Sequence, residues 1–169
     1  MAHVTLILGG ARSGKSARAL ALAPSQPRIF VATGEALDDE MAERIAKHQA
    51  ERGEGWELVE APLDLFTALM SNTHSAATVV IDCLTLWLSN MMHHEWDIEA
   101  ETKALVEALG TVEGRVILVS NELGLGLAPM EPLSRTFRDA QGRLNQAIAA
   151  AADRVEFVAA GLPLVLKGG

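Results

Sequence analysis

Short runs of apolar, largely β-branched residues alternate along this chain with longer stretches of helical periodicity. The first run, residues 4–8, ends in two glycines, and similar runs occupy residues 28–32, 78–81 and 116–119. Apolar runs of this length are typical of strands buried on both faces of a parallel sheet. Polar residues or glycine follow each run, where the carboxyl end of a strand would carry chemistry.

Helical patterns fill the intervals between these runs. They cover residues 16–23, 39–52, 98–109 and 138–152. The second pattern begins with an aspartate cap and stops at Gly53. Strands that alternate with helices connect through right-handed crossovers, so we expect an α/β protein with three layers and a mostly parallel sheet.

Two late apolar runs, residues 155–159 and 162–166, predict an antiparallel pair at one edge of the sheet that turns at Gly161. The longest stretches without periodicity are residues 53–64 and 121–136. We expect both to be loops, which carry function more often than framework.

The composition, with 49% hydrophobic and 21% charged residues, is that of an ordinary globular protein. A chain of 169 residues is long enough for one domain with a substantial core, so we expect a single domain over residues 1–169. The net charge of −8 argues against nucleic-acid binding. It does not exclude a phosphate ligand, because a local cluster of cations can bind phosphate on an acidic protein. The single cysteine, Cys83, fits a reducing cytosol. No apolar run is long enough to span a bilayer, so we expect a cytoplasmic protein without stable membrane insertion.

A phosphate-binding motif follows the first predicted strand and opens the first predicted helix. It matches G-x-x-x-x-G-K-[ST] at every fixed position with Gly9, Gly10, Ala11, Arg12, Ser13, Gly14, Lys15 and Ser16. In this motif the backbone N–H groups surround phosphate oxygens, the lysine reaches the β- and γ-phosphates, and the final hydroxyl ligates Mg²⁺. A chance match arises on the order of a few times in 10⁵ positions. The motif therefore predicts a bound nucleoside triphosphate with Mg²⁺.

The apolar run over residues 79–81 is followed by the carboxylate of Asp82. This is the pattern of a Walker B element, whose aspartate helps to hold Mg²⁺ in a P-loop enzyme. A strand-end aspartate alone is often only a turn or helix cap. Beside the phosphate motif it predicts a metal site formed by Ser16 and Asp82.

His48 shares a helical stripe with Met41, Ile45 and Arg52, and it follows Arg44 by four residues. One interpretation is a surface histidine beside two arginines, which is the commoner situation for an isolated histidine. The other is a nucleophile, since a neutral imidazole attacks phosphorus to form a phosphoramidate while nearby arginines stabilise the transferred group. The pattern alone leaves both interpretations open.

Further segments combine into a pattern that is more specific than the phosphate motif. They are residues 32–33, 38–41, 44–45 and 48, residues 82–90, residues 120–122 with Gly124 and Gly126, and finally Arg135, 137–139, Gly142, 145–146, 152–153 and 161–164. With them the chain resembles, nearly end to end, the bifunctional adenosylcobinamide kinase/adenosylcobinamide-phosphate guanylyltransferase family of cobalamin biosynthesis.

The resemblance implies two reactions at one nucleotide site of a RecA-like P-loop fold. ATP or GTP phosphorylates the aminopropanol hydroxyl of adenosylcobinamide, and GTP then gives GMP to that phosphate through a guanylylated histidine, releasing pyrophosphate. The position of that nucleophile matches His48. Beyond the phosphate motif, the family's nucleotide contacts match Thr33, Gly34, Glu35, Gln49, Ala50, Glu51, Arg52, Glu60 and Asp82. The resemblance also implies a corrinoid substrate, Mg²⁺ and a homotrimer.

We expect the loop over residues 121–129 to contribute to the corrinoid site and not to the nucleotide site, because it follows a strand end and contains two glycines. Two alternatives remain: a single-function P-loop small-molecule kinase in which His48 is structural, and a RecA-like ATPase module that binds a partner. The acidic charge and the absence of a basic arm speak against the module.

Overall fold

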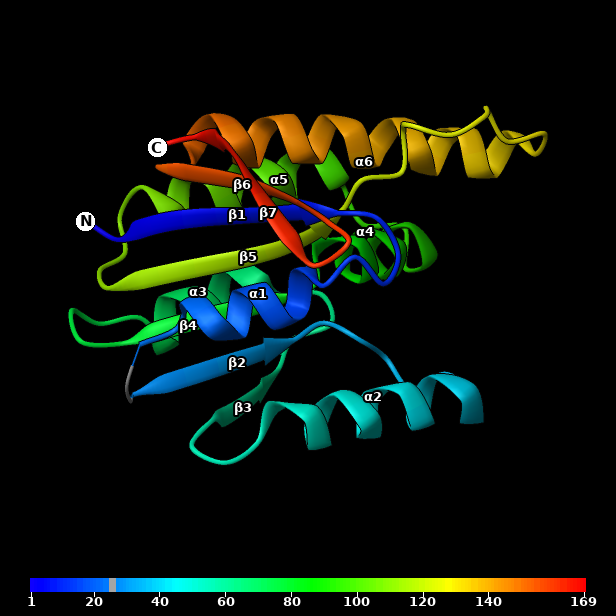
Figure 1. Ribbon diagram of the computed structural model, residues 1–169. Coiled ribbons are helices and arrows are strands. Elements are labelled where there is room, and N and C mark those ends of the chain that lie inside the picture. The colour runs from blue at the N-terminus through cyan, green and yellow to red at the C-terminus, as the bar shows by residue number, and fades with distance from the viewer. Residues whose placement is uncertain (25–26) are drawn as a thin grey trace.

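A seven-stranded sheet forms the middle layer of the protein (Figure 1). The structure is a computed structural model that describes residues 1–24 and 27–169. The strand order is β3-β2-β4-β5-β1-β6-β7, in which every neighbouring pair is parallel except β6 and β7. The strands are β1 (His3–Gly9), β2 (Arg28–Ala32), β3 (Glu57–Glu60), β4 (Thr78–Asp82), β5 (Arg115–Asn121), β6 (Arg154–Ala159) and β7 (Leu162–Lys167).

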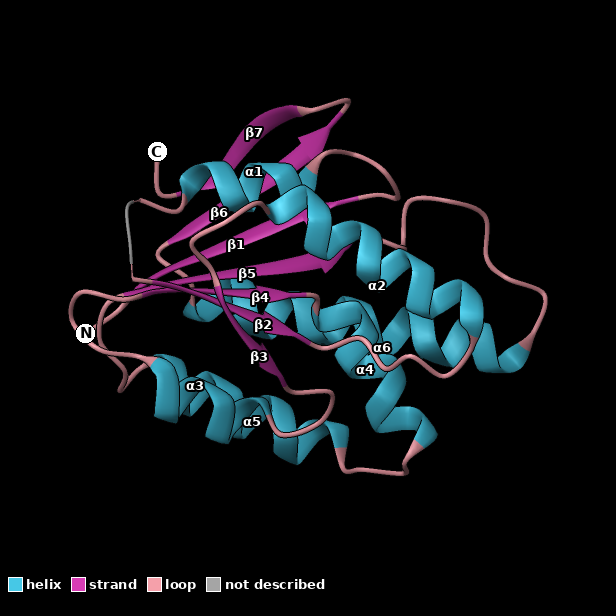
Figure 2. Ribbon diagram, turned by 90° about the horizontal axis from the view of Figure 1, so that it is seen from below, coloured by secondary structure: helices cyan, strands magenta, loops and turns pink. Residues whose placement is uncertain are grey.

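Helices cover both faces of this sheet (Figure 2). They are α1 (Lys15–Leu22), α2 (Asp39–Arg52), α3 (Leu65–Asn72), α4 (Leu84–His93), α5 (Ile98–Leu109) and α6 (Pro132–Ala151). Helices α3 to α6 pack on one face, whereas α1 and α2 lie on the other side and α2 extends past the carboxyl ends of the strands. Over residues 1–24 and 27–169, no helix is both long and apolar enough to cross a membrane.

The sheet separates two hydrophobic clusters. In β1, Leu6 and Leu8 belong to the larger cluster beneath α3 to α6, while Ile7 belongs to the smaller cluster beneath α1. Because successive side chains of a strand point to opposite faces, a strand covered on both sides needs apolar residues throughout. This explains the uninterrupted apolar runs in the sequence and confirms the predicted three-layer, mostly parallel α/β fold.

The helix that carries His48 has the bounds predicted from the sequence, Asp39–Arg52. The carboxylate of Asp38 accepts a hydrogen bond from the backbone N–H of Met41 at 2.7 Å, as an N-cap does. The antiparallel pair of β6 and β7 is also confirmed.

Both loop predictions were wrong in part, because each of the two stretches contains regular structure. Residues 53–64 include β3, an edge strand with no buried residue, so it needs no continuous apolar run. Residues 121–136 include the start of α6, which begins at Pro132, a residue well suited to the first helical turn. Helix α3 was not predicted from the sequence. Helix α4 was also not predicted, because it is buried on several sides and shows no single apolar stripe.

The turn between β6 and β7 contacts the phosphate motif. The backbone N–H of Gly161 donates a hydrogen bond of 2.7 Å to the carbonyl oxygen of Ser13. The edge hairpin therefore supports the loop from the side opposite α2.

A buried carboxylate on β6 also holds α1 in place. Glu156 is fully buried and accepts hydrogen bonds from Arg18 of α1 at 2.7 and 2.9 Å and from Arg154 at 2.9 Å. The hydrogen bond from Arg18 lowers the pKa of Glu156 most, and that from Arg154 lowers it further. The carboxylate is thus held ionised between two guanidinium groups.

We expect Glu156→Gln to lower the free energy of unfolding by about 2 kcal/mol at neutral pH, because both arginines lose an ionic partner. Since the folded-state pKa of Glu156 is lowered, the stabilisation is present above the ordinary glutamate pKa and is lost as the pH falls through the folded-state value. Urea unfolding of both proteins at decreasing pH should show the difference disappearing. The exposed Glu113→Gln serves as the control, and a difference that stays constant with pH would contradict the assignment.

Candidate nucleotide site

The phosphate motif forms a tight loop between β1 and α1. Gly14 caps α1 with a φ of 96°, a left-handed conformation that favours glycine. A side chain on Gly9 would collide with the Ser13 hydroxyl and with the carbonyl oxygen of Val158, 2.7 Å away. The Lys15 ammonium donates a hydrogen bond of 2.9 Å to the carbonyl oxygen of Gly10, across the loop. The backbone thus adopts the curled form that phosphate binding requires.

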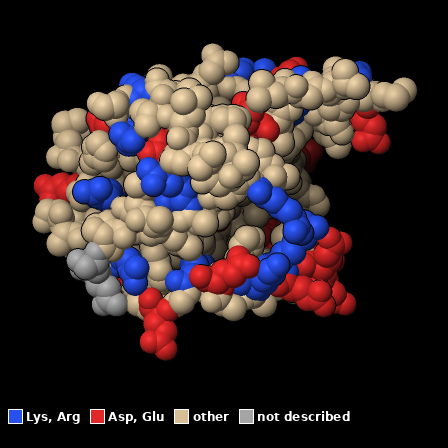
Figure 3. All heavy atoms as spheres, viewed as in Figure 1, with Lys and Arg blue, Asp and Glu red and all other residues tan. Residues whose placement is uncertain are grey.

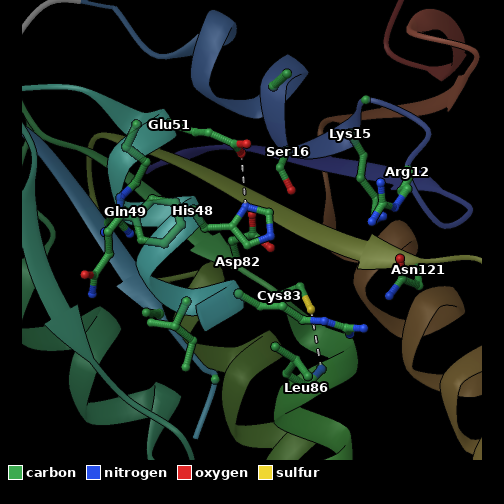
Figure 4. A pocket seen from close by; sticks show the side chains of 18 of the residues that line it. Arg12, Lys15, Ser16, His48, Gln49, Glu51, Asp82, Cys83, Leu86 and Asn121 are labelled. Carbon is green, nitrogen blue, oxygen red and sulfur yellow. Dashed lines mark hydrogen bonds and ion pairs between the residues drawn. The ribbon is translucent and has the colours of Figure 1, made fainter. Parts of the chain in front are cut away.

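A cavity of about 520 Å³ lies between this loop, α2 and the carboxyl ends of β2 and β4 (Figure 4). Its walls include many of the residues that the sequence predicted for the nucleotide site: Arg12, Ser13, Gly14, Lys15, Ser16, Gly34, His48, Gln49, Glu51, Arg52 and Asp82. The structure therefore brings together residues that are up to 70 positions apart in the sequence, from Arg12 to Asp82.

The cavity is locally basic although the whole chain is acidic. Four basic side chains line it, Arg12, Lys15, Arg44 and Arg52, against the carboxylates of Glu51 and Asp82. Figure 3 shows basic side chains beside the hollow above α2, with acidic side chains towards the outer edge. A local excess of cations attracts a polyanion such as a nucleoside triphosphate even on an acidic protein.

Asp82 and Ser16 bring two side-chain oxygens next to each other inside the cavity. Burial raises the pKa of the Asp82 carboxyl above its ordinary value. A hydrogen bond from Ser16 opposes this rise, as do the nearby basic side chains: His48, Lys15 and Arg52. Within the described residues, no group of three or more His, Cys, Asp or Glu side chains is arranged to hold a metal alone. Two protein oxygens beside a phosphate-binding loop fit Mg²⁺, which completes its coordination with water and phosphate oxygens.

The imidazole of His48 projects from α2 into the cavity, close to Asp82 (Figure 4). Its side chain is 63% exposed, and its Nδ1 lies 3.5 Å from the Glu51 carboxylate one turn along the helix. A carboxylate at Nδ1 favours a proton on that nitrogen, which leaves the Nε2 lone pair free. His48 therefore lies in the cavity with a ring that is accessible to a bound ligand.

Helix α2 is held mainly at its carboxyl end. The guanidinium of Arg52 stacks on the ring of Phe30, 3.9 Å from its centroid. Ile45 packs closely against Gly34, where a Cβ would lie 3.4 Å from the isoleucine side chain. None of the fourteen residues of α2, all of which the structure describes, is buried. Arg44 pairs with Glu40 at 2.6 Å along the same helix.

Cys83 also lines the cavity but is not suited to nucleophilic chemistry. Burial, together with the charge of Asp82, raises the pKa of its thiol to about 11. Only the thiolate is an effective nucleophile, so at neutral pH this cysteine is inert. Its sulfur accepts the backbone N–H of Leu86 at 3.4 Å and caps α4.

Some sequence-predicted residues lie outside the cavity. The hydroxyl of Thr33 is buried against Cys83, donating to its carbonyl oxygen at 2.7 Å and accepting from its N–H at 2.9 Å. Glu35 pairs with His94 at 3.2 Å, and Glu60 borders a separate pocket next to Trp96. The cavity walls also do not include Gly9, Gly10, Ala11 and Ala50.

Asn121 was placed by the sequence with the corrinoid loop and away from the nucleotide, but the structure places it in the nucleotide cavity. It is the last residue of β5, which lies between β1 and β4. The sequence contains the polar residue at the strand end but not the strand order. That order is what brings Asn121 to the phosphate loop.

Comparisons with known proteins identify relatives along nearly the whole chain. Residues 5–166 match the family described as cobinamide kinase / cobinamide phosphate guanyltransferase. The bifunctional adenosylcobalamin biosynthesis protein CobP of Pseudomonas aeruginosa is 47% identical over 167 residues, which cover 96% of each chain. The corresponding protein CobU of Escherichia coli is 38% identical over 178 residues, covering 96% of this chain and 98% of its own.

Solved structures with little sequence identity share the fold. A protein of Pyrococcus horikoshii OT3 superposes with a TM-score of 0.58 at 8% identity, covering 98% of this chain and 86% of its own. The flagellar accessory protein FlaH of Methanocaldococcus jannaschii superposes with a TM-score of 0.52 at 12% identity, covering 98% and 78%. These likenesses support the P-loop fold alone.

Proposed function

The chain belongs to the cobinamide kinase / cobinamide phosphate guanyltransferase family, and on that premise we propose that its one nucleotide cavity serves two successive reactions. The enzyme phosphorylates adenosylcobinamide with ATP or GTP and then transfers GMP from GTP to the new phosphate, giving adenosylcobinamide-GDP and pyrophosphate. The observation that carries the proposal is that Lys15, at the phosphate loop, and His48, on a separate helix, line the same cavity.

In the kinase reaction the protein contributes position and charge more than covalent chemistry. The N–H groups of the loop and the Lys15 ammonium hold the β- and γ-phosphates. The substrate hydroxyl attacks the γ-phosphorus, the bond to the β-phosphate oxygen breaks, and the nucleoside diphosphate leaves. Cationic groups fixed beside the triphosphate stabilise the charge that develops on the leaving group.

In the guanylyl reaction His48 divides the transfer into two displacements. Its Nε2 attacks the α-phosphorus of GTP, and pyrophosphate leaves with the electrons of the broken P–O bond. The phosphate of the corrinoid then attacks the same phosphorus and releases the imidazole. The carboxylate of Glu51 lies beside Nδ1 and stabilises the proton on that nitrogen throughout.

Ser16 and Asp82 would hold Mg²⁺ in this site. When bound, the ion neutralises charge on the phosphate oxygens and fixes their orientation. The predicted nucleotide contacts of Thr33, Glu35, Ala50 and Glu60, which lie outside the cavity walls, stay predictions.

We expect Asp82→Asn to raise the Mg²⁺ concentration needed for half-maximal kinase activity roughly ten- to a hundredfold, since the neutral amide is a weaker partner for the ion. Folding should change little, because the carboxylate faces the cavity. Kinase assays over a Mg²⁺ titration measure the shift, and thermal unfolding gives the control. An unchanged Mg²⁺ dependence would show that Asp82 does not help to hold the ion.

The proposal also includes a cytoplasmic homotrimer in which each chain forms one P-loop domain. Exposed apolar side chains on β7 support contacts between copies, with Leu162 72% and Leu164 62% exposed. The corrinoid is proposed to contact the loop over residues 122–129, where Leu125 and Leu127 are exposed and Arg138 holds the loop through the carbonyl oxygens of Gly124 and Gly126.

Product analysis separates this function from its alternatives. The protein is incubated with adenosylcobinamide, Mg²⁺ and GTP, and the corrinoids are resolved by chromatography and mass spectrometry. The bifunctional enzyme forms first the phosphate and then the GDP derivative. A single-function kinase would stop at the phosphate, and an ATPase module would form neither corrinoid product.

A further inference from the structure

The side-chain amide of Asn121 lies in the nucleotide cavity and has no role in either reaction as described above. Its Oδ1 is buried and has no hydrogen-bond partner in the part of the chain that the structure describes. In Figure 4 the amide lies at the end of β5, on the same side of the cavity as Arg12 and Lys15. The Nδ2 of the same amide is not buried and makes no hydrogen bond within the described residues, so it is the atom of Asn121 that is open to a ligand in the cavity.

The position of β5 aims this amide at the phosphate end of the cavity. Strand β5 lies between β1, which leads into the phosphate loop, and β4, which ends at Asp82. In the register of the sheet Asn121 pairs with Gly9, the first residue of the loop, and Val119 pairs with Asp82. Asn121 therefore extends beyond the metal-binding strand and beside the loop that holds the terminal phosphates.

Side chains from two helices fix the backbone of Asn121. The hydroxyl of Thr85, on α4, accepts its N–H at 2.9 Å. The amide of Asn145, on α6, donates to its carbonyl oxygen at 3.0 Å. Asn145 is itself held in a buried network by Ser120 at 2.7 Å and Gln141 at 3.0 Å. With its backbone held in this way, Asn121 is preorganised for binding, as groups at functional sites are.

We propose that Asn121 is a catalytic residue of the kinase reaction. This proposal rests on the function proposed above. Its Nδ2 donates a hydrogen bond to an oxygen of the γ-phosphate. The amide thus orients the γ-phosphate and stabilises the charge on its oxygens while the corrinoid hydroxyl attacks the γ-phosphorus. As the new O–P bond forms and the bond to the β-phosphate oxygen breaks, the amide keeps its protons, and the hydroxyl proton leaves to solvent with the products.

This role belongs to only one of the two reactions. In the guanylyl reaction the bond that breaks is at the α-phosphorus, and the attacking group is the imidazole of His48. Neither the γ-phosphate nor the corrinoid hydroxyl takes part in that bond change. Loss of the Asn121 amide should therefore separate the two activities in the direction opposite to loss of His48.

The test compares Asn121→Ala with the wild-type protein in three measurements. These are kinase turnover, the single-turnover rate of His48 guanylylation by GTP, and the affinities for a non-hydrolysable GTP analogue and for GDP. We expect kinase turnover to fall roughly 10²-fold, as for the loss of one preorganised donor at a transition state. Guanylylation should change less than about threefold, and affinity should fall for the triphosphate analogue but not for GDP.

A second variant and a control keep the test decisive. Asn121→Asp places a carboxylate against the γ-phosphate and should weaken binding of the analogue more than alanine does, still without affecting GDP. Asn72→Ala, which removes an amide that donates to the Ala68 carbonyl on α3, should change none of the three measurements. Equal loss of both activities, loss of GDP affinity, or normal kinase turnover in both Asn121 variants overturns the proposal. If the wild-type protein itself forms no corrinoid phosphate, the proposed function fails instead.

Discussion

Lys15→Ala is expected to lower both the kinase and the guanylyl-transfer rates by at least roughly 10²-fold. Both reactions need the triphosphate held in the loop between β1 and α1, and the Lys15 ammonium is a cation of that loop. It already spans the loop through its hydrogen bond to Gly10, so it lies where the phosphates would enter. Removing it costs about 3 kcal/mol or more of transition-state stabilisation.

Steady-state assays of both activities check this expectation. The matched control is Lys103→Ala, which removes an exposed lysine that pairs with Glu107 along α5. The control should keep both activities and the same thermal stability. Near-normal turnover of Lys15→Ala in either assay would remove Lys15 from that reaction.

His48→Asn should lower guanylyl transfer by several orders of magnitude, on the order of 10³-fold or more, because an amide cannot form a phosphoramidate. The kinase reaction should be retained in part, since the corrinoid hydroxyl attacks the γ-phosphorus directly. The fold should tolerate the change: the side chain is 63% exposed, and a substitution on an open helix face costs a few tenths of a kcal/mol, roughly the difference in helix propensity.

The control for this prediction is His74→Asn, an exposed histidine before β4, at the opposite end of that strand from the cavity. It should leave both activities unchanged. Loss of both activities in His48→Asn, with folding and GTP binding preserved, would indicate a shared positioning role. Retention of both would make His48 a surface histidine and favour the single-function kinase.

The parts of the site that depend on local sequence could be predicted, and those that depend on strand order could not. The phosphate loop is set by residues close in sequence, because the glycines and Lys15 need only a strand before them and a helix after them. Asp82 could be anticipated for the same reason, as the end of an apolar strand. Asn121 has no local signal that distinguishes it from other strand-end residues. Its role appears only when β5 is found between β1 and β4.

The side-chain pairs on α2 also could not be predicted from the sequence. Periodicity placed His48 and Arg44 on one helix face and suggested that both act on the transferred group. In the structure Arg44 is paired with Glu40, and the residue next to the His48 ring is Glu51. Side-chain pairing among exposed charges along a helix involves small energy differences, a few tenths of a kcal/mol per pair, so the pattern of charges does not determine which pairs form.

The most direct test of the account is whether GTP labels His48 covalently. The protein is incubated with Mg²⁺ and GTP carrying ³²P at the α-position, or in parallel at the γ-position, without corrinoid. The account predicts that only the α-label stays with the denatured protein, in a bond that is labile to acid and to hydroxylamine, and that mass spectrometry finds GMP on His48. The label should be absent from His48→Asn and from Lys15→Ala, and adding adenosylcobinamide phosphate should transfer it to the corrinoid. Formation of adenosylcobinamide-GDP without any covalent label would contradict the account, because GMP would then pass directly from GTP to the corrinoid phosphate.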